Sequence, residues 1–402
     1  MIITETRNKL RVVVERSAGP VSYIGLAVNA GSRDDPSQHP GLAHFLEHTI
    51  FKGTRRRRAW HISNRMERIG GELNAYTAKE MTMVYTTAPS GYTERALELL
   101  ADLILNASFP TVETERERDI VIEEIHSYQD SPSDAVFDEF DELIYAGSGL
   151  AHNILGSVES VRELDGRNAR AFLDRFYVPS NMALYCVVSD PDRALKLIDK
   201  YFGGMQFTFA GHDRHTPVVV EPFELDRDRD TSQANTIVGC RVPGRYDPGR
   251  YALMLFNNIL GGPALNSILC QQIRERRGLA YTIESNLSLM SDCGTFCVYF
   301  GSEHSTVAKC QRLVREHIAR LADRRLSNRA FAQARDQYCG QLSVLSDNRE
   351  NCAMSMGRSL LLYGDVRSLS HTAEQIREVT PEQLRAAAES VASQNLSRLS
   401  LL

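Results

Sequence analysis

Two histidines and a glutamate that could form a catalytic metal site lie within the five residues from His44 to His48, with Glu47 between them. On an α-helix, which turns ~100° per residue, the two imidazoles and the carboxylate fall within an arc of roughly 100°. The apolar residues of the same segment project to the opposite side: Leu42, Leu46 and Ile50. Two histidines four residues apart can hold one metal ion, and the adjacent carboxylate can accept a proton from metal-bound water. The segment therefore predicts a core-anchored helix that carries two ligands and a base.

A catalytic zinc site usually has a third protein ligand, and the acid-rich segment 113–126 offers candidates. Within it, Glu117 and Glu124 are seven residues apart, ~20° from eclipsed on a helix, and are flanked by apolar residues. Such carboxylates need a partner, which a metal or a metal-bound histidine would supply. Glu123 is the alternative ligand, but it points ~100° away from Glu124. Another interpretation is a solvated helix face on which arginines and glutamates form salt bridges.

The spacing of these residues resembles the M16 (pitrilysin / mitochondrial processing peptidase-like) metallopeptidases. Glu124 lies 76 residues after His48, and the order His-x-x-Glu-His is the inverzincin signature. The resemblance implies that His44, His48 and Glu124 bind one zinc ion per chain. It also implies that Glu47 is the catalytic base and that Glu117 is a supporting catalytic carboxylate. Two imidazoles and one carboxylate favour zinc, although ligand type alone leaves manganese and cobalt open.

The resemblance covers nearly the whole chain and identifies it as an M16B-type short subunit. The matching stretches are 31–53, which contains the metal segment, 70–77, 176–182, 274–281 and the residues from 260 onward. By the same resemblance, Arg274 and Tyr281 hold the substrate near the scissile bond. A strand over 72–87 is expected to be a sheet edge that accepts the substrate as an added strand. Asn74 in this strand is either a contact to the substrate backbone or a turn or bulge residue.

The chain has room for two domains and shows an internal duplication. Its 402 residues, 43% of them hydrophobic, suffice for two packed cores. Residues 161–164 correspond to residues 376–379, displaced by 215 positions. We therefore expect a zinc-binding domain over 1–210 and a related domain over 218–402 that lacks the metal motif, joined within Gly203–Asp230. The resemblance implies an α+β fold of two homologous α/β units, each a mostly antiparallel sheet packed with helices (LuxS/MPP-like), forming half of a clamshell with the active cavity between the halves.

Composition and charge exclude several other classes of protein. The net charge of −5 argues against a general nucleic-acid binder. The concentrated basic run Arg55–Arg58 is either a recruiting site for acidic or extended peptides or a solvated loop. No run of ~18 apolar residues is present and the N-terminus becomes charged early, so we expect a cytoplasmic protein without membrane association. The eight cysteines are interpreted as reduced packing residues, with a metal clip by Cys293 and Cys297 as the alternative.

Together with the resemblance, these features predict a zinc-dependent endopeptidase that hydrolyses unfolded oligopeptides or small polypeptides, and the resemblance implies that this occurs inside a closed chamber. Two chains would enclose the peptide substrate. Because this chain carries both the zinc motif and the Arg274–Tyr281 pair, a homodimer is expected, with a heterodimer as the alternative. The second hypothesis is a non-catalytic M16-like structural or partner subunit. Retention of all five metal-site residues favours the enzyme.

Overall fold

The computed structural model describes residues 1–205 and 209–402, and these divide into two compact units. Unit 1 consists of Met1–Ile125, His152–Arg214 and Ser346–Leu369. Unit 2 consists of His126–Ala151, His215–Leu345 and Ser370–Leu402. Each unit thus contains one segment from the opposite half of the sequence. The units therefore differ from the expected continuous domains over 1–210 and 218–402. Residues 206–208 of the predicted join lie outside the described residues.

Unit 1 is built on a six-stranded sheet with the order β1-β2-β6-β3-β5-β4. Its strands are β1 (Ile2–Glu5), β2 (Arg11–Arg16), β3 (Val21–Val28), β4 (Glu72–Thr77), β5 (Thr82–Pro89) and β6 (Met182–Val188). Strands β2 and β6 are parallel, and the other neighbouring pairs are antiparallel. Strand β4 is an edge strand, as expected.

The prediction of one continuous strand over 72–87 is wrong, because β4 and β5 form a hairpin. The chain reverses between Ala78 and Met81, whose N–H···O=C bond measures 2.8 Å. The two turn residues between them, Lys79 and Glu80, are buried. They lack the glycine, proline or asparagine that normally indicates a turn. Their tertiary partners fix the turn instead: the Glu80 carboxylate pairs with Arg33 at 2.7 Å.

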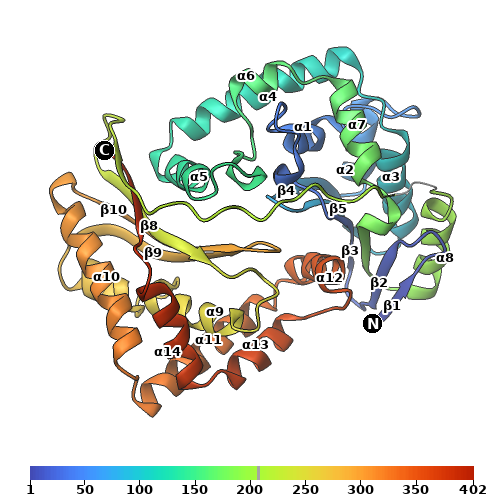
Figure 1. Ribbon diagram of the computed structural model, residues 1–402. Helices are drawn as coiled ribbons and strands as arrows, with labels where there is room; N and C mark the ends of the chain where they lie inside the picture. The colour runs from blue at the N-terminus through green and yellow to red at the C-terminus, as the bar shows by residue number, and fades with distance from the viewer. Residues whose placement is uncertain (206–208) are drawn as a thin grey trace. The chain divides into compact units, whose positions relative to one another are not determined.

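Helices cover both faces of the unit 1 sheet. They are α1 (Leu42–Thr49), α2 (Ala59–Glu67), α3 (Thr93–Asn106), α4 (Thr111–Gln129), α6 (Val158–Arg162), α7 (Gly166–Phe176), α8 (Pro191–Phe202) and α12 (Arg349–Tyr363), with short 3-10 turns η1 (Ser32–Asp34) and η3 (Pro179–Asn181). Helix α4 runs four residues past the unit boundary at Ile125. Alternate strand residues enter two different apolar clusters, since Val12 and Val14 pack with α1, α3 and α8 while Val13 packs with α12. Figure 1 shows α1 and α3 on one side of this sheet and α12 on the other.

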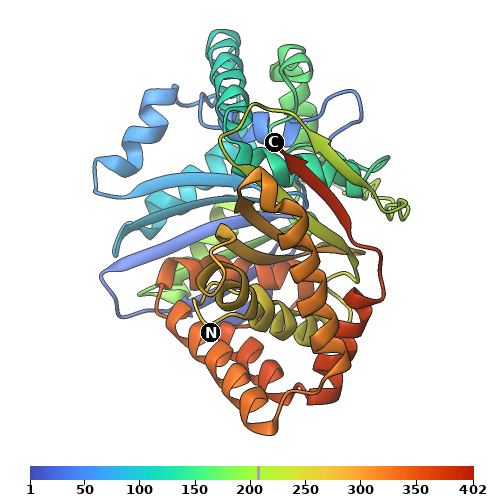
Figure 2. The same cartoon turned by 90° about the vertical axis from the view of Figure 1, so that its left-hand side faces the viewer.

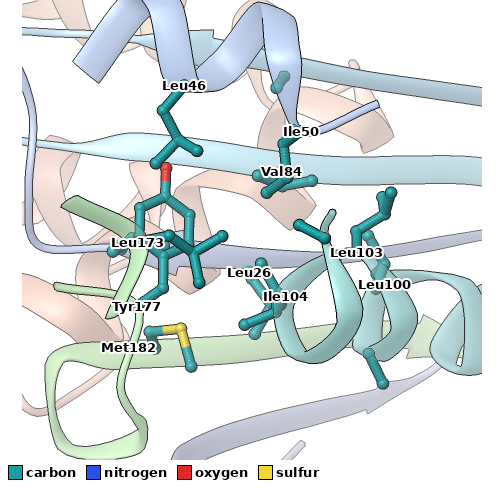
Figure 3. Close-up of a cluster of buried hydrophobic side chains, with 14 of the residues drawn as sticks. Leu26, Leu46, Ile50, Val84, Leu100, Leu103, Ile104, Leu173, Tyr177 and Met182 are labelled. Atoms are coloured by element: carbon teal, nitrogen blue, oxygen red, sulfur yellow. The ribbon is translucent and has the colours of Figure 1, made fainter. Parts of the chain in front are cut away.

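The apolar cluster beneath α1 holds that helix against the sheet (Figure 3). Leu46 points from α1 toward Tyr177, and Ile50, directly after α1, lies beside Val84 of β5; both are fully buried. Burial of a leucine-sized side chain contributes about 1.5–3 kcal/mol. The apolar face of α1 therefore fixes the position of its opposite, polar face.

Unit 2 has a five-stranded sheet with the order β7-β11-β8-β10-β9. Its strands are β7 (Glu224–Arg227), β8 (Ala234–Val242), β9 (Ala280–Leu289), β10 (Gly294–Ser302) and β11 (Ser397–Leu401). Its helices are α5 (Pro132–Ile144), η2 (Gly149–Ala151), α9 (Arg250–Gly261), η4 (Cys270–Glu275), η5 (His304–Thr306), α10 (Val307–Asp323), α11 (Asn328–Leu345), α13 (Leu369–Glu378) and α14 (Pro381–Ala392). The apolar side of α5 packs on one face of the sheet, and Phe256 of α9 packs on Phe296 of β10 on the other.

The two sheets confirm the internal duplication. Strands β7, β11, β8, β10 and β9 stand in the same order as β2, β6, β3, β5 and β4, and each sheet has its parallel pair at the corresponding place. The two units also exchange equivalent helices: α12 packs on the sheet of unit 1, and α5 packs on the sheet of unit 2. The fold is the predicted α+β arrangement of two homologous units. None of the described helices is both long and apolar enough to cross a membrane.

Candidate metal centre

The start of α1 is fixed by a buried carboxylate and a glycine. The Asp35 side chain accepts hydrogen bonds from the N–H groups of Gly41 and Ala43, both at 2.8 Å. Oxygen acceptors at this position satisfy the N–H groups that are left free at the start of a helix. Gly41 has a φ of 88°, and a Cβ atom on it would come within 2.5 Å of the Leu155 carbonyl oxygen. Only glycine fits at this position. The Asp35 carboxyl group and Gly41 together fix the first turn of the ligand-bearing helix.

His44, His48 and Glu124 bring three potential ligand atoms together. The Glu124 Oε2 atom is 3.4 Å from His48 Nε2 and 3.7 Å from His44 Nε2. All three ligand atoms lie within 4.8 Å of one another, and no other group of three or more histidine, cysteine or acidic residues in the described part of the chain does so. Two ligands at ~2.0–2.1 Å from one tetrahedral zinc ion stand roughly 3.3–3.4 Å apart. The separations to Glu124 are close to this value, so the donor set fits zinc.

The protonation of His44 suits a ligand. Its side chain is 8% exposed, and burial, followed by the charge of His48, lowers its pKa from 6.5 to about 3. The imidazole is therefore neutral near pH 7 and keeps a lone pair for a metal ion. The two imidazole rings contact each other edge-on, with centroids 4.6 Å apart. Such close packing of two histidines would be unfavourable if both were protonated.

His48 is oriented by a second carboxylate. Its Nδ1 atom is 3.3 Å from Glu117 Oε2, which leaves Nε2 facing Glu124. The other oxygen of Glu117 pairs with Lys52 Nζ at 2.8 Å. Glu117 is buried, whereas the Lys52 side chain is 29% exposed. A carboxylate on the distal nitrogen of a ligand histidine fixes the tautomer and makes the imidazole a better ligand.

Glu47 points toward the edge strand and is held there by Thr77. Thr77 Oγ1, at the end of β4, donates a hydrogen bond of 2.6 Å to Glu47 Oε2. Burial raises the pKa of Glu47, against the opposing effects of the Thr77 hydrogen bond and of His48. A raised pKa brings a glutamate closer to the range in which it can both accept and return a proton near neutral pH.

The remaining candidate site residues from the sequence lie in both units. Glu123 is exposed on the outer side of α4, as its helical angle predicts. Asn74 lies within the regular register of β4 rather than in a turn or bulge, and its Oδ1 atom accepts from the adjacent Ala75 N–H. In unit 2, Arg274 lies in the last turn of η4 with its guanidinium 3.6 Å from Glu275, and Tyr281 in β9 is 61% exposed.

The structure bears on two alternative interpretations of the sequence, the salt-bridged face of α4 and the cysteine metal clip. Part of α4 does carry a solvated ion pair, Arg116 with Glu113, so that face of the helix coexists with the ligand face. Seven of the eight cysteines are buried, and Cys293 and Cys297 lie in an apolar cluster. Three residues near the centre were not identified from sequence. Lys52 and Thr77 act through partners distant in sequence, whereas Asp35 bonds to the start of the helix that begins a few residues later.

The sequence matches two family models and several curated relatives. The family model described as Insulinase (Peptidase family M16) matches residues 11–158, and the one described as Peptidase M16 inactive domain matches residues 164–338. The chain is 34% identical to an uncharacterized zinc protease of Mycobacterium leprae, over 94% of this chain and 86% of that protein. It is 28% identical to the mitochondrial-processing peptidase subunit beta of Bos taurus, over 97% of this chain and 83% of that protein.

Solved structures show the same fold. A protease from Helicobacter pylori superposes with a TM-score of 0.91 at 19% identity, covering 100% of this chain and 99% of that one. A structure described as a peptidase M16 inactive domain from Pseudomonas fluorescens also has a TM-score of 0.91, at 20% identity, covering 100% of this chain and 97% of that one. Two family models that together span most of the sequence, and a relative at 34% identity over nearly its whole length, lead to one conclusion: the chain belongs to peptidase family M16.

Proposed function

We propose that this chain is a zinc-dependent endopeptidase. The observation that carries the proposal is the convergence of His44, His48 and Glu124 on one point, with the Glu47 carboxylate on the same helix as the two histidines. Zinc, when bound there, supplies a Lewis acid that polarises the scissile carbonyl and lowers the pKa of a bound water. One ion per chain would be held by the three ligands.

The side chains of the centre have separate roles in peptide hydrolysis. Glu47 accepts the proton of the attacking water and returns it to the leaving amine. Thr77 fixes the Glu47 carboxylate through its 2.6 Å hydrogen bond. Glu117 orients His48 and carries the Lys52 ammonium as its counter-charge. Direct attack by water requires no covalent intermediate on the protein.

The proposed substrate is an unfolded oligopeptide or small polypeptide. Strand β4 is the last strand of its sheet, so its outer edge can pair with an extended peptide, and Thr77 at its end contacts Glu47. Main-chain pairing along β4 would place the peptide beside the base and would make sequence preference weak. Asn74 is exposed in this strand and is proposed as a backbone contact. Arg274 and Tyr281, both with exposed side chains, are proposed to hold the substrate near the scissile bond.

The proposed assembly is a homodimer that closes a chamber around the substrate in the cytoplasm. A heterodimer is the alternative, and the bovine relative is itself named as a subunit. The second candidate function, a non-catalytic partner subunit, is favoured only by the description of the family model over residues 164–338 as an inactive domain. The metal-site residues all lie before that stretch, which favours the enzyme.

The test is cleavage of a quenched fluorescent peptide library by the native chain and by Glu47→Gln, with zinc content measured on both. We expect the native chain to cleave and Glu47→Gln to retain zinc with hydrolysis near background. Glu123→Gln is the matched control, because it removes one acid from the exposed side of α4. Equal cleavage by the native chain and Glu47→Gln would remove Glu47 from the mechanism. Absence of both zinc and cleavage in the native chain would favour the non-catalytic subunit.

A further inference from the structure

The loop between α1 and α2 is rigid and carries four consecutive arginines. Gly53 and Arg58 pair across it as an isolated β-bridge, and Thr54 pairs with Ala107 in the same way. The Thr54 hydroxyl accepts hydrogen bonds from the N–H groups of Arg56 and Arg57 at 3.1 and 2.9 Å. It donates a third, of 2.8 Å, to the buried carboxylate of Asp102. The backbone of the loop is therefore preorganised.

One of the four arginines anchors the loop to α3. Arg57 bonds to Asp102 at 2.5 Å and to Glu98 at 2.6 Å, and its side chain is 17% exposed. Arg65 of α2 binds the second oxygen of Glu98 at 2.7 Å. The two acids beneath the loop are thus already neutralised. They leave little negative charge to compensate the neighbouring arginines.

The other three arginines face solvent. Arg55 and Arg58 are exposed and have no ion-pair partner among residues 1–205 and 209–402. The Arg56 side chain is 65% exposed, and its nearest acidic atom is 3.8 Å away on Asp102. Trp60, the one tryptophan in the chain, follows in the first turn of α2 and is 65% exposed, in edge-on contact with His61. In Figure 2, α2 is the lighter-blue helix at the outer edge of unit 1.

We propose that this cationic surface, defined as residues 53–58 together with Trp60, docks an extended acidic segment of a polypeptide. The proposal rests on the proposed peptidase function and adds a preference for substrates that carry acidic residues away from the scissile bond. Guanidinium groups pair with carboxylates in two-pronged fashion, and an exposed indole packs on extended chain. A loop whose backbone is already fixed loses little entropy when it binds.

The chemistry of α2 favours a polypeptide over a membrane surface. The apolar residues of this helix, Ile62 and Met66, are fully buried and cannot enter a bilayer. Trp60 would be the single large apolar side chain available for insertion. Glu67, seven residues further and on the same side of the helix, is exposed and would be repelled by anionic lipid. An acidic peptide can instead pair with the arginines and avoid Glu67.

The test is the binding of dye-labelled octaglutamate to the full chain, measured by fluorescence anisotropy. Octaglutamine is the neutral control peptide. The test variant is Arg55→Gln/Arg58→Gln, and the matched control is Arg324→Gln/Arg329→Gln, which removes two exposed arginines of unit 2. Two exposed ion pairs correspond to roughly a 2- to 30-fold loss of affinity. We expect this loss in the test variant and an unchanged dissociation constant in the control. Binding should weaken with salt.

Three results would overturn the proposal. These are equal binding of octaglutamine, equal losses in both double variants, and absence of octaglutamate binding in the native chain. The fluorescence emission of Trp60 distinguishes peptide binding from membrane binding. A blue shift with phosphatidylglycerol vesicles but not with octaglutamate would assign the surface to lipid. Binding does not require hydrolysis. Octaglutamate binding without cleavage of the peptide library would therefore contradict the peptidase function alone, and cleavage without octaglutamate binding would contradict the docking surface alone.

Discussion

Replacement of Glu117 by glutamine should weaken zinc binding without disturbing the three ligands. The Glu117 carboxylate is 3.3 Å from His48 Nδ1 and 2.8 Å from Lys52 Nζ, and it is buried. Glutamine preserves the shape but removes the charge that stabilises both partners. Its amide can also donate to Nδ1, which would favour the imidazole tautomer with the proton on the ligand nitrogen. The substitution therefore opposes metal binding in two ways.

The expected magnitude follows from the role of such oriented carboxylates. Loss of a hydrogen-bonding partner behind a ligand histidine typically lowers metal affinity 10- to 100-fold, or about 1.4–2.7 kcal/mol. The assay is competition for zinc against a chelating dye, with the native chain and Glu117→Gln titrated side by side. Glu115→Gln is the control, because Glu115 is an exposed acid on the same helix. An unchanged zinc affinity in Glu117→Gln, or an equal loss in Glu115→Gln, would refute the reasoning.

Two further outcomes test the neighbouring residues. Thr77→Val should lower kcat by roughly 10- to 150-fold with little change in KM, because a hydrogen bond to a charged group contributes about 1.5–3 kcal/mol, and Thr77→Ser should restore it. Steady-state kinetics decide this, and a change confined to KM would contradict it. In the unfolded, metal-free chain, the His44 imidazole has a pKa of about 6.5 and takes up a proton below that pH. In the folded state, burial lowers its pKa to about 3. Stability should therefore fall as the pH decreases through this window, by about 2 kcal/mol at pH 5. Urea titrations at pH 7 and pH 5 measure this, and His44→Gln should flatten the difference.

The parts of the fold that depend on helical periodicity or on the internal repeat were predictable from the sequence. The apolar and polar faces of α1 follow from its spacing, and the displaced repeat indicates two related units whose strand orders agree. The exchange of α5 and α12 was not predictable, because an amphipathic pattern shows that a helix packs but not on which sheet. The hairpin between β4 and β5 was missed for a similar reason. Its turn depends on Arg33, which lies far from Glu80 in sequence.

The metal site was likewise predictable where its residues belong to one helix. His44, Glu47 and His48 are defined by one helical turn, and the helical angle separates Glu124 from Glu123. The pairing of the two helices came from family resemblance rather than from any local pattern. Asp35 and Thr77 were missed because an acid before a helix and a threonine in a strand are common. The contact of Asp35 with Gly41 is local, whereas only tertiary structure brings Thr77 to Glu47.

The joint binding of one zinc ion by α1 and α4 is the feature on which the proposed function depends. Its most direct test is an anomalous difference map, recorded at the zinc absorption edge from crystals of the full chain grown with zinc. We expect one peak per chain, at roughly 2.0–2.2 Å from a nitrogen of His44, a nitrogen of His48 and an oxygen of Glu124. A peak coordinated by Glu123, or zinc bound at another place with these three side chains unoccupied, would contradict the assignment.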